Sequence, residues 1–164
     1  MQSSVLRKSW GLIVSANKVS TIDLDTMALT VWAEARGELP SGQKAVAWVI
    51  RNRWENPRWW SRQRGDGIPD DTIAAVCRDP YQFSCWNSGD PQSKRLKDPA
   101  TLNLSDVQDI RVLCEKVLSE SLDDDLTNHA DHYCTRWVAH KTKWAKERTP
   151  VAKIGSHWFY RIEI

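Results

Sequence analysis

The sequence predicts an α+β fold, rich in helix, with a small β region near its C-terminal end. Apolar residues recur at helical spacing in three long segments, and short runs of strand-forming residues occur only late in the chain. A length of 164 residues is enough for one hydrophobic core. We therefore expect a lead-in over residues 1–22 and a single domain over residues 23–164.

The first predicted helix starts at about Asp25. Its apolar residues follow the spacing of a helix with one buried face and are Leu24, Met27, Ala28, Val31, Trp32 and Ala35. Gly37 suits the position just after a helix, and Pro40 follows closely. This segment should pack one face against the core.

The next predicted helix runs from about Ser41 to Trp54 and is apolar on nearly all sides, so it should be buried. A polar loop follows over residues 55–70. Asp70 or Asp71 is then expected to cap a short helix that ends before Pro80.

The remaining chain is predicted to hold one more helix and two short strands. Residues 82–86 are expected to be a strand or an extended segment, and residues 87–103 a loop. The helix should open with a Ser-x-x-Gln capping box formed by Ser105 and Gln108. The strands are expected near residues 132–135 and 158–162.

The composition argues against several classes of protein. The 23 Lys and Arg nearly balance the 21 Asp and Glu, and a net charge of +2 is too small to bind duplex nucleic acid by charge alone. No apolar run approaches the length of about 20 residues that a membrane helix needs. The apolar stretch at residues 10–16 is too short for a secretion signal. We expect no nucleic-acid partner and no stable membrane insertion.

The cysteines do not form a metal-binding pattern. No Cys-x-x-Cys pair occurs among Cys77, Cys85, Cys114 and Cys134, so a zinc ribbon is not expected. Without a secretion signal, free thiols are the default, and a bridge between Cys77 and Cys85 stays open.

Tryptophan is unusually frequent, with 10 Trp against 3 Tyr and 2 Phe. Trp combines a flat apolar face with one N–H donor, which suits the recognition of bases or sugars. Trp59, Trp60 and Trp86 fall in predicted loops and are the candidates for stacking on such a ligand. Trp32 and Trp48 lie on core helices and should pack there. Ordinary packing remains an equal alternative for the loop tryptophans.

One acidic residue stands out in the last turn of the first helix. Helix geometry of about 100° per residue places Glu34 at the border of the apolar stripe, beside Met27. Partial burial and the negative end of the helix both favour the neutral acid form, which a general acid needs. The alternative is that Glu34 and Glu38 are solvated, with Arg36 serving solubility.

Several blocks of sequence occur in the order typical of one enzyme family. They are Ala33-Glu34-Ala35-Arg36-Gly37-Glu38, Gly42-Gln43 to Asn52-Arg53, Pro69 to Cys77, Gln82-Phe83-Ser84-Cys85-Trp86, His132-Tyr133, Trp144-Ala145, and Ile154-Gly155 to Tyr160. Together they span roughly residues 25–161. In this order they resemble the SleB-like cell-wall hydrolases, the spore-cortex-lytic enzymes and their bacteriophage relatives.

The resemblance implies a lysozyme-like, two-lobed domain that cuts the glycan strands of peptidoglycan. It implies that Glu34 is the catalytic acid. It also implies substrate-binding positions near the cleft, to which we add the loop tryptophans; together these are Glu38, Gln82, Ser84, Trp86, Tyr133, Trp59 and Trp60. No cofactor and no metal are implied. His129 and Cys134 stand where relatives often carry Gly and His, which weakens metal ligation around His132.

One carboxyl group is sufficient for a lytic transglycosylation. Glu34 would protonate the β-1,4 oxygen between N-acetylmuramic acid and N-acetylglucosamine, then accept a proton from the muramic C6 hydroxyl and leave a 1,6-anhydro end. Hydrolysis by a lysozyme mechanism needs a second carboxylate, roughly 5–9 Å from the first. No second acid stands in a comparable motif, so transglycosylation is favoured and a hydrolytic muramidase is the alternative.

Two further classes remain open. A non-catalytic peptidoglycan-binding module would explain the tryptophans without an acid. A metal-dependent hydrolase would use His129, His132 and His157, the first two on one helix face, although no His-Glu-x-x-His motif is present. The short chain resembles a phage endolysin, so we expect a monomer that stays in the host cytoplasm until a holin releases it to the cell wall.

Overall fold

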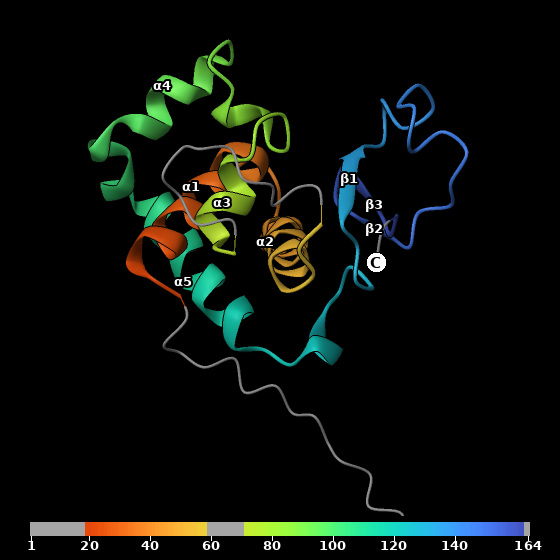
Figure 1. Cartoon of the computed structure of the whole chain (residues 1–164), viewed down its shortest axis with the longest axis horizontal. Helices are drawn as coiled ribbons and strands as arrows, with labels where there is room; N and C mark the ends of the chain where they lie inside the picture. Colours follow the sequence, from red (N-terminus) through yellow and green to blue (C-terminus); the bar gives the residue numbers. More distant parts are fainter. Residues whose placement is uncertain (1–18, 59–70, 163–164) are drawn as a thin grey trace, which may run out of the picture.

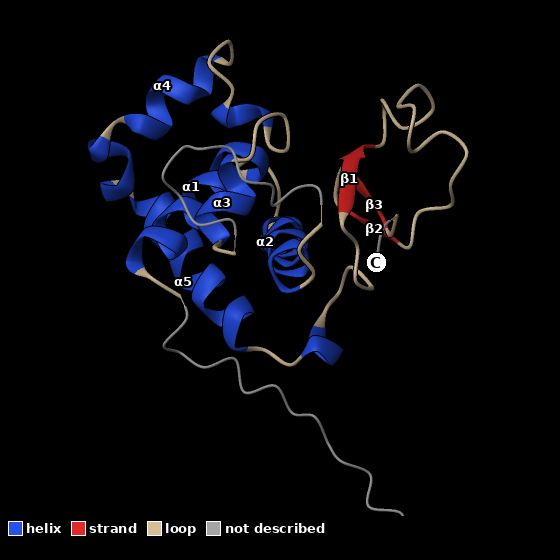
Figure 2. Cartoon of the chain, viewed as in Figure 1, coloured by secondary structure: helices blue, strands red, loops and turns tan. Residues whose placement is uncertain are grey.

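A computed structural model of the chain describes residues 19–58 and 71–162. The helices gather on one side and a three-stranded sheet lies on the other, with α2 between them (Figures 1 and 2). The elements of this part are α1 (Thr21–Ala35), α2 (Pro40–Glu55), α3 (Ile73–Arg78), the 3-10 turn η2 (Ser84–Trp86), α4 (Pro91–Lys97), η3 (Pro99–Asn103), α5 (Ser105–Ser119), η4 (Leu122–Asp124), β1 (His132–Thr135), β2 (Ala152–Ile154) and β3 (His157–Tyr160).

The helical part is built around α1, which packs against α2, α3 and α5. Its apolar stripe is buried as predicted, with Met27 and Val31 fully enclosed. Trp32 and Trp48 are also buried, which confirms that these two tryptophans belong to the core. Because α1 is held on three sides, the position of its last turn is fixed by the core.

A second apolar cluster joins the sheet to the helical part. Ala45 and Val49 of α2 pack against Ala130 and Phe159. The sheet is antiparallel in the order β1-β3-β2, and Tyr133 of β1 lies opposite Phe159 of β3. Tyr133 packs against both clusters, so β1 is anchored beside the helices.

Three predicted helix starts are wrong in detail. α1 begins at Thr21, inside the predicted lead-in, because Ser20 and Asp23 form a capping box. The hydroxyl of Thr72 accepts the N–H of Ala75 and caps α3, the role predicted for an aspartate. The capping box predicted at α5 does not form. Leu104 is the N-cap there and has no side-chain bond, and the Gln108 side chain bonds the Leu102 carbonyl instead.

The middle of the chain holds more helix than predicted. Residues 82–86 contain the η2 turn and no strand, and the predicted loop at 87–103 contains α4 and η3. Asp90 and Asp98 cap these two short helices, and each aspartate is followed by a proline in the first turn. These segments are stabilised by caps, which a search for apolar periodicity overlooks.

The β region is close to the prediction. β1 has the predicted bounds, and β3 begins one residue before the predicted strand and ends two residues before its end. β2 was not predicted, because it has only three residues. All four cysteines are free thiols, so the Cys77–Cys85 bridge is not formed. In residues 19–58 and 71–162, no helix is both long and apolar enough to cross a bilayer.

Candidate active site

Glu34 and Tyr133 meet where the last turn of α1 faces β1. The Tyr133 hydroxyl donates a 2.8 Å hydrogen bond to Glu34 Oε2, although the two residues are 99 positions apart. Glu34 is half-buried, as its predicted place at the border of the apolar stripe requires. Arg36 turns away from this pair, stacking on Trp32 and donating to Gln92.

Burial determines which partner supplies the proton in this hydrogen bond. Desolvation, together with the nearby charge of Glu34, raises the pKa of Tyr133 well above its usual value. Burial beside Glu34 also raises the pKa of the Cys85 thiol, whose side chain hydrogen-bonds Glu34. Both groups therefore keep their protons and hold the Glu34 carboxyl from two elements, β1 and η2. A carboxyl fixed in this way can exchange a proton with a bound substrate.

His157 of β3 packs against the Tyr133 ring of β1. The two rings meet edge to face, with centroids 5.1 Å apart. Desolvation lowers the pKa of His157, although the charges of Glu38 and Glu34 act in the opposite direction. His157 is buried, and its Nδ1 lies 3.6 Å from Glu38 Oε1 without a hydrogen bond in the described part of the chain.

Glu38 binds the turn between β2 and β3. Its carboxylate accepts the backbone N–H of Ser156 at 3.2 Å and the hydroxyl of the same residue. Burial alone would raise the pKa of Glu38, but these two hydrogen bonds and the nearby His157 hold it below its usual value. The structure therefore places Glu38 against the sheet, at 15% side-chain exposure.

Gln82 and Ser84 lie on the segment that carries Cys85. Gln82 accepts a 3.3 Å hydrogen bond from Arg53 Nη1, and Ser84 is exposed at the start of η2. Arg53 is itself buried and also donates to the Asp131 carbonyl at 2.6 Å. This segment is thereby tied to α2 and to the entry of β1, but neither predicted side chain has a hydrogen bond to Glu34.

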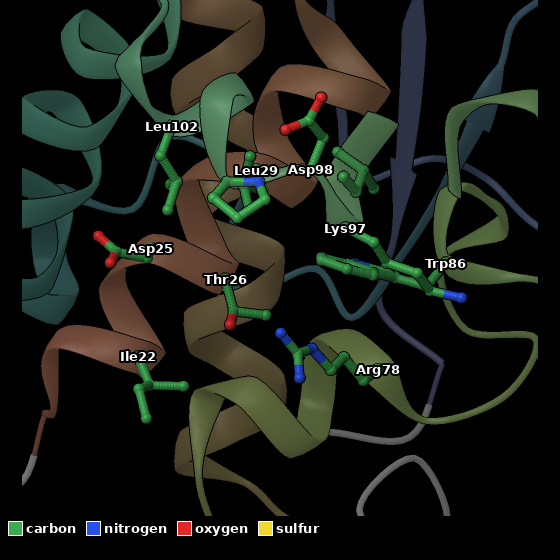
Figure 3. Close-up of a pocket in the computed structure, with 11 residues that line it drawn as sticks. Ile22, Asp25, Thr26, Leu29, Arg78, Trp86, Lys97, Asp98 and Leu102 are labelled. Atoms are coloured by element: carbon green, nitrogen blue, oxygen red, sulfur yellow. The ribbon is translucent and has the colours of Figure 1, made fainter. Parts of the chain in front are cut away.

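Trp86 lines a cavity of about 500 Å³ that neither Glu34 nor Tyr133 lines. Figure 3 shows Ile22 and Thr26 along α1 on one side of it and Trp86 with Lys97 on the other. The indole N–H of Trp86 donates to Thr30, and Arg78 covers one ring face at 5.0 Å. Trp86 is therefore half-buried and fixed. Trp59 and Trp60 lie outside the described residues.

The three histidines considered as metal ligands do not come together. His132 Nδ1 lies 2.9 Å from Asp131, His129 is in a turn with φ of 61°, and His157 is beside Tyr133. His129 and His132 do not share a helix, because β1 begins at His132. Within the described ranges, no group of three His, Cys, Asp or Glu side chains has a metal-binding arrangement.

Sequence reasoning missed two contributors to this cluster. Cys85 contacts Glu34, and Ser156 binds Glu38. One signal was available: Gly155 precedes Ser156 in a block singled out from the sequence and adopts φ of 58°, which marks a tight turn. Cys85 also stands in such a block, but nothing in the sequence indicated that its thiol would lie against Glu34, because that contact depends on the tertiary structure.

Comparisons with known proteins agree with this architecture. A protein-family model described as Cell Wall Hydrolase matches residues 37–160, and a search of curated proteins finds no match. Two solved structures match with TM-scores of 0.60 and 26% identity over 87% of this chain. They are the catalytic domain of the Bacillus cereus SleB protein, with 92% of that chain covered, and that of the germination-specific lytic transglycosylase SleB from Bacillus anthracis, with 97% covered.

These matches confirm the predicted fold class, a helix-rich α+β domain with a lysozyme-like fold. The range of the family model includes Glu38, Tyr133 and His157, and Glu34 lies three residues before it.

Proposed function

The chain belongs to the Cell Wall Hydrolase family, and on this premise we propose that it cleaves the glycan strands of peptidoglycan with Glu34 as general acid and base. The observation that carries the proposal is the hydrogen bond from Tyr133 to Glu34. It fixes one carboxyl group between the two parts of the molecule. Relatives that include a lytic transglycosylase catalytic domain support the choice of substrate.

The reaction needs one proton donor that later becomes an acceptor. Glu34 protonates the β-1,4 oxygen that follows N-acetylmuramic acid, and the bond from this oxygen to C1 breaks. The Glu34 carboxylate then takes the proton of the muramic C6 hydroxyl, while the oxygen of that hydroxyl forms a new bond to C1. The product is a 1,6-anhydro end, and Glu34 regains the protonated form in which it began.

Transglycosylation is favoured over hydrolysis because the carboxylates near Glu34 are hydrogen-bonded to other parts of the chain. A hydrolytic enzyme of the lysozyme type positions a second carboxylate for the nucleophile or for water. Two other carboxylates whose charges reach this site are Glu38 and Asp90. Glu38 is bound by Ser156, and Asp90 caps α4 by accepting the N–H of Gln92. Both carboxylates are therefore engaged in hydrogen bonds that stabilise the fold, and neither is positioned as the second acid of a hydrolytic mechanism.

A phage endolysin is the biological role that we propose for this activity. The chain would act as a monomer on the peptidoglycan of the host, without a cofactor, after release from the cytoplasm through a holin. Synthesis in a host with and without a holin tests this role, because lysis should require the holin.

Mass spectrometry of digested peptidoglycan tests the chemistry. The wild-type chain should release anhydro-muramic ends, and Glu34→Gln should release none while keeping its fold. Glu115→Gln, which removes a half-exposed carboxylate on α5, is the matched control and should keep full activity. Reducing muramic ends would indicate hydrolysis instead. Wall binding without any cleavage by the wild type would indicate a binding module, and an active Glu34→Gln variant would refute the assignment of Glu34.

A further inference from the structure

Glu38 occupies a cradle that is shaped for its side chain. A methyl group at Gly42 would lie 2.8 Å from Glu38 Cβ, and one at Gly155 would collide with Glu38 Oε2. Gly42 belongs to the first turn of α2 and Gly155 to the turn between β2 and β3. Two elements from different parts of the molecule therefore leave room for this one carboxylate.

The carboxylate joins these two parts through Ser156 and His157. Ser156 supplies two hydrogen-bond donors, its N–H and its hydroxyl, and the next residue places its imidazole Nδ1 3.6 Å from Glu38 Oε1. At this distance the imidazole is in electrostatic but not hydrogen-bond contact. Glu38 thus fixes the backbone of the turn by hydrogen bonds and lies in electrostatic contact with the ring that follows it.

The His157 ring in turn supports Tyr133. It meets the Tyr133 ring edge to face on one side, and Phe159 contacts the same tyrosine at a centroid distance of 5.8 Å. The hydroxyl at the far end of that tyrosine holds Glu34. A continuous series of contacts therefore runs from Glu38 through His157 and Tyr133 to the carboxyl group that we assign to catalysis.

We propose that Glu38 is a positioning residue, which sets the Glu34–Tyr133 pair by holding Ser156 and His157 in place. The inference rests on the proposed function of Glu34, because it assigns Glu38 a role in that reaction without contact to the substrate. It agrees with the proposed reaction, in which Glu38 does not attack the sugar, because its carboxylate is bound by Ser156.

The test separates positioning from general destabilisation. Glu120 is the matched control, because its side chain is 13% exposed against 15% for Glu38, and it bonds Lys44 on α2 without taking part in the series of contacts. The variants are Glu38→Ala, Glu38→Gln and Glu120→Ala. Ser156→Ala, which removes one donor only, is the milder variant if Glu38→Ala fails to fold.

Two measurements are made on each variant. The first is kcat and KM on soluble glycan fragments. The second is fluorine NMR of the full chain labelled with 3-fluorotyrosine, in which three tyrosines give three resonances and Tyr133→Phe identifies that of Tyr133. The NMR signal needs no activity, so it reports on positioning even if the chain proves inert on peptidoglycan and the proposed function fails.

Glu38→Ala should lower kcat about tenfold and change KM less than about twofold, and it should shift or broaden the Tyr133 resonance. Glu38→Gln should have a smaller effect, because its amide oxygen still accepts from Ser156. Glu120→Ala should lower the stability of the chain by a similar amount but leave both kcat and the Tyr133 resonance unchanged. An unchanged Tyr133 resonance in Glu38→Ala and Ser156→Ala, or equal changes in Glu120→Ala, would overturn the proposal.

Discussion

At the scale of single residues, burial keeps Tyr133 and His157 uncharged beside two carboxylates. It raises the pKa of the phenol and lowers that of the imidazole. The buried histidine has a consequence for stability. In the unfolded chain the imidazole of His157 has its ordinary pKa of 6.5, whereas in the folded chain its pKa is lower, so it binds a proton only at lower pH.

We expect His157 to make the folded state sensitive to mild acid. Between its unfolded and folded pKa values the unfolded state holds more protons, so the free energy of unfolding falls as pH decreases from about 6.5 and levels off below the folded value. The charged or titratable groups facing His157 are Glu34, Glu38 and Tyr133. Urea unfolding at several pH values measures this slope, and His157→Phe should reduce it. Equal slopes in the two proteins would contradict the assignment.

At the scale of elements, the hairpin of β2 and β3 depends on the turn at Gly155. A residue with a Cβ at φ of 58° is strained, and its methyl group would displace the Glu38 carboxylate. Gly155→Ala should therefore lower the free energy of unfolding by at least about 1–2 kcal/mol. It should also impair catalysis.

Gly37→Ala is the control for this prediction. No atom lies within 4 Å of a methyl group placed at Gly37. The change there should stay within about 0.5 kcal/mol. Urea unfolding of both variants decides the matter, and a similar loss at the two positions would show that the turn does not require glycine.

At the scale of the whole molecule, charge is distributed unevenly between the sheet and the rest. Residues 132–162 hold seven of the 23 Lys and Arg and one of the 21 Asp and Glu. Many of these basic side chains, including Lys141, Lys143 and Lys146, are exposed. The small net charge of the chain therefore conceals a region rich in basic residues over 132–162, which suits an anionic polymer.

We expect binding to anionic cell walls to weaken as salt is added, because exposed charges are screened. Joint replacement of Lys141, Lys143 and Lys146 by Gln should reduce binding at low salt and flatten the salt dependence. The same change at Lys94, Lys97 and Lys116, exposed on helices, should have a smaller effect. Sedimentation with purified walls at increasing salt measures both, and equal losses in the two triple variants would contradict this expectation.

Local pattern predicted most of the helical part and the last-turn position of Glu34. In α1 the apolar residues recur with the repeat of a helix, and this repeat determines which residues share a face. It therefore predicts both the buried face of α1 and the place of Glu34 at the border of that face. It also separated core tryptophans such as Trp32 from the others. Pattern failed for α4 and η3, since segments this short are stabilised by Asp caps and prolines more than by a buried face.

The sequence by itself determined the helices α1, α2, α3 and α5, the strands β1 and β3, the family resemblance and the candidate acid. Only the tertiary structure decided what surrounds that acid. Tyr133 reaches Glu34 across 99 residues, and Glu38, expected to contact substrate, binds Ser156 across 118. The reason is physical. Backbone hydrogen bonds and apolar periodicity are properties of neighbouring residues, whereas these contacts exist only once α2 has packed against both the helices and the sheet.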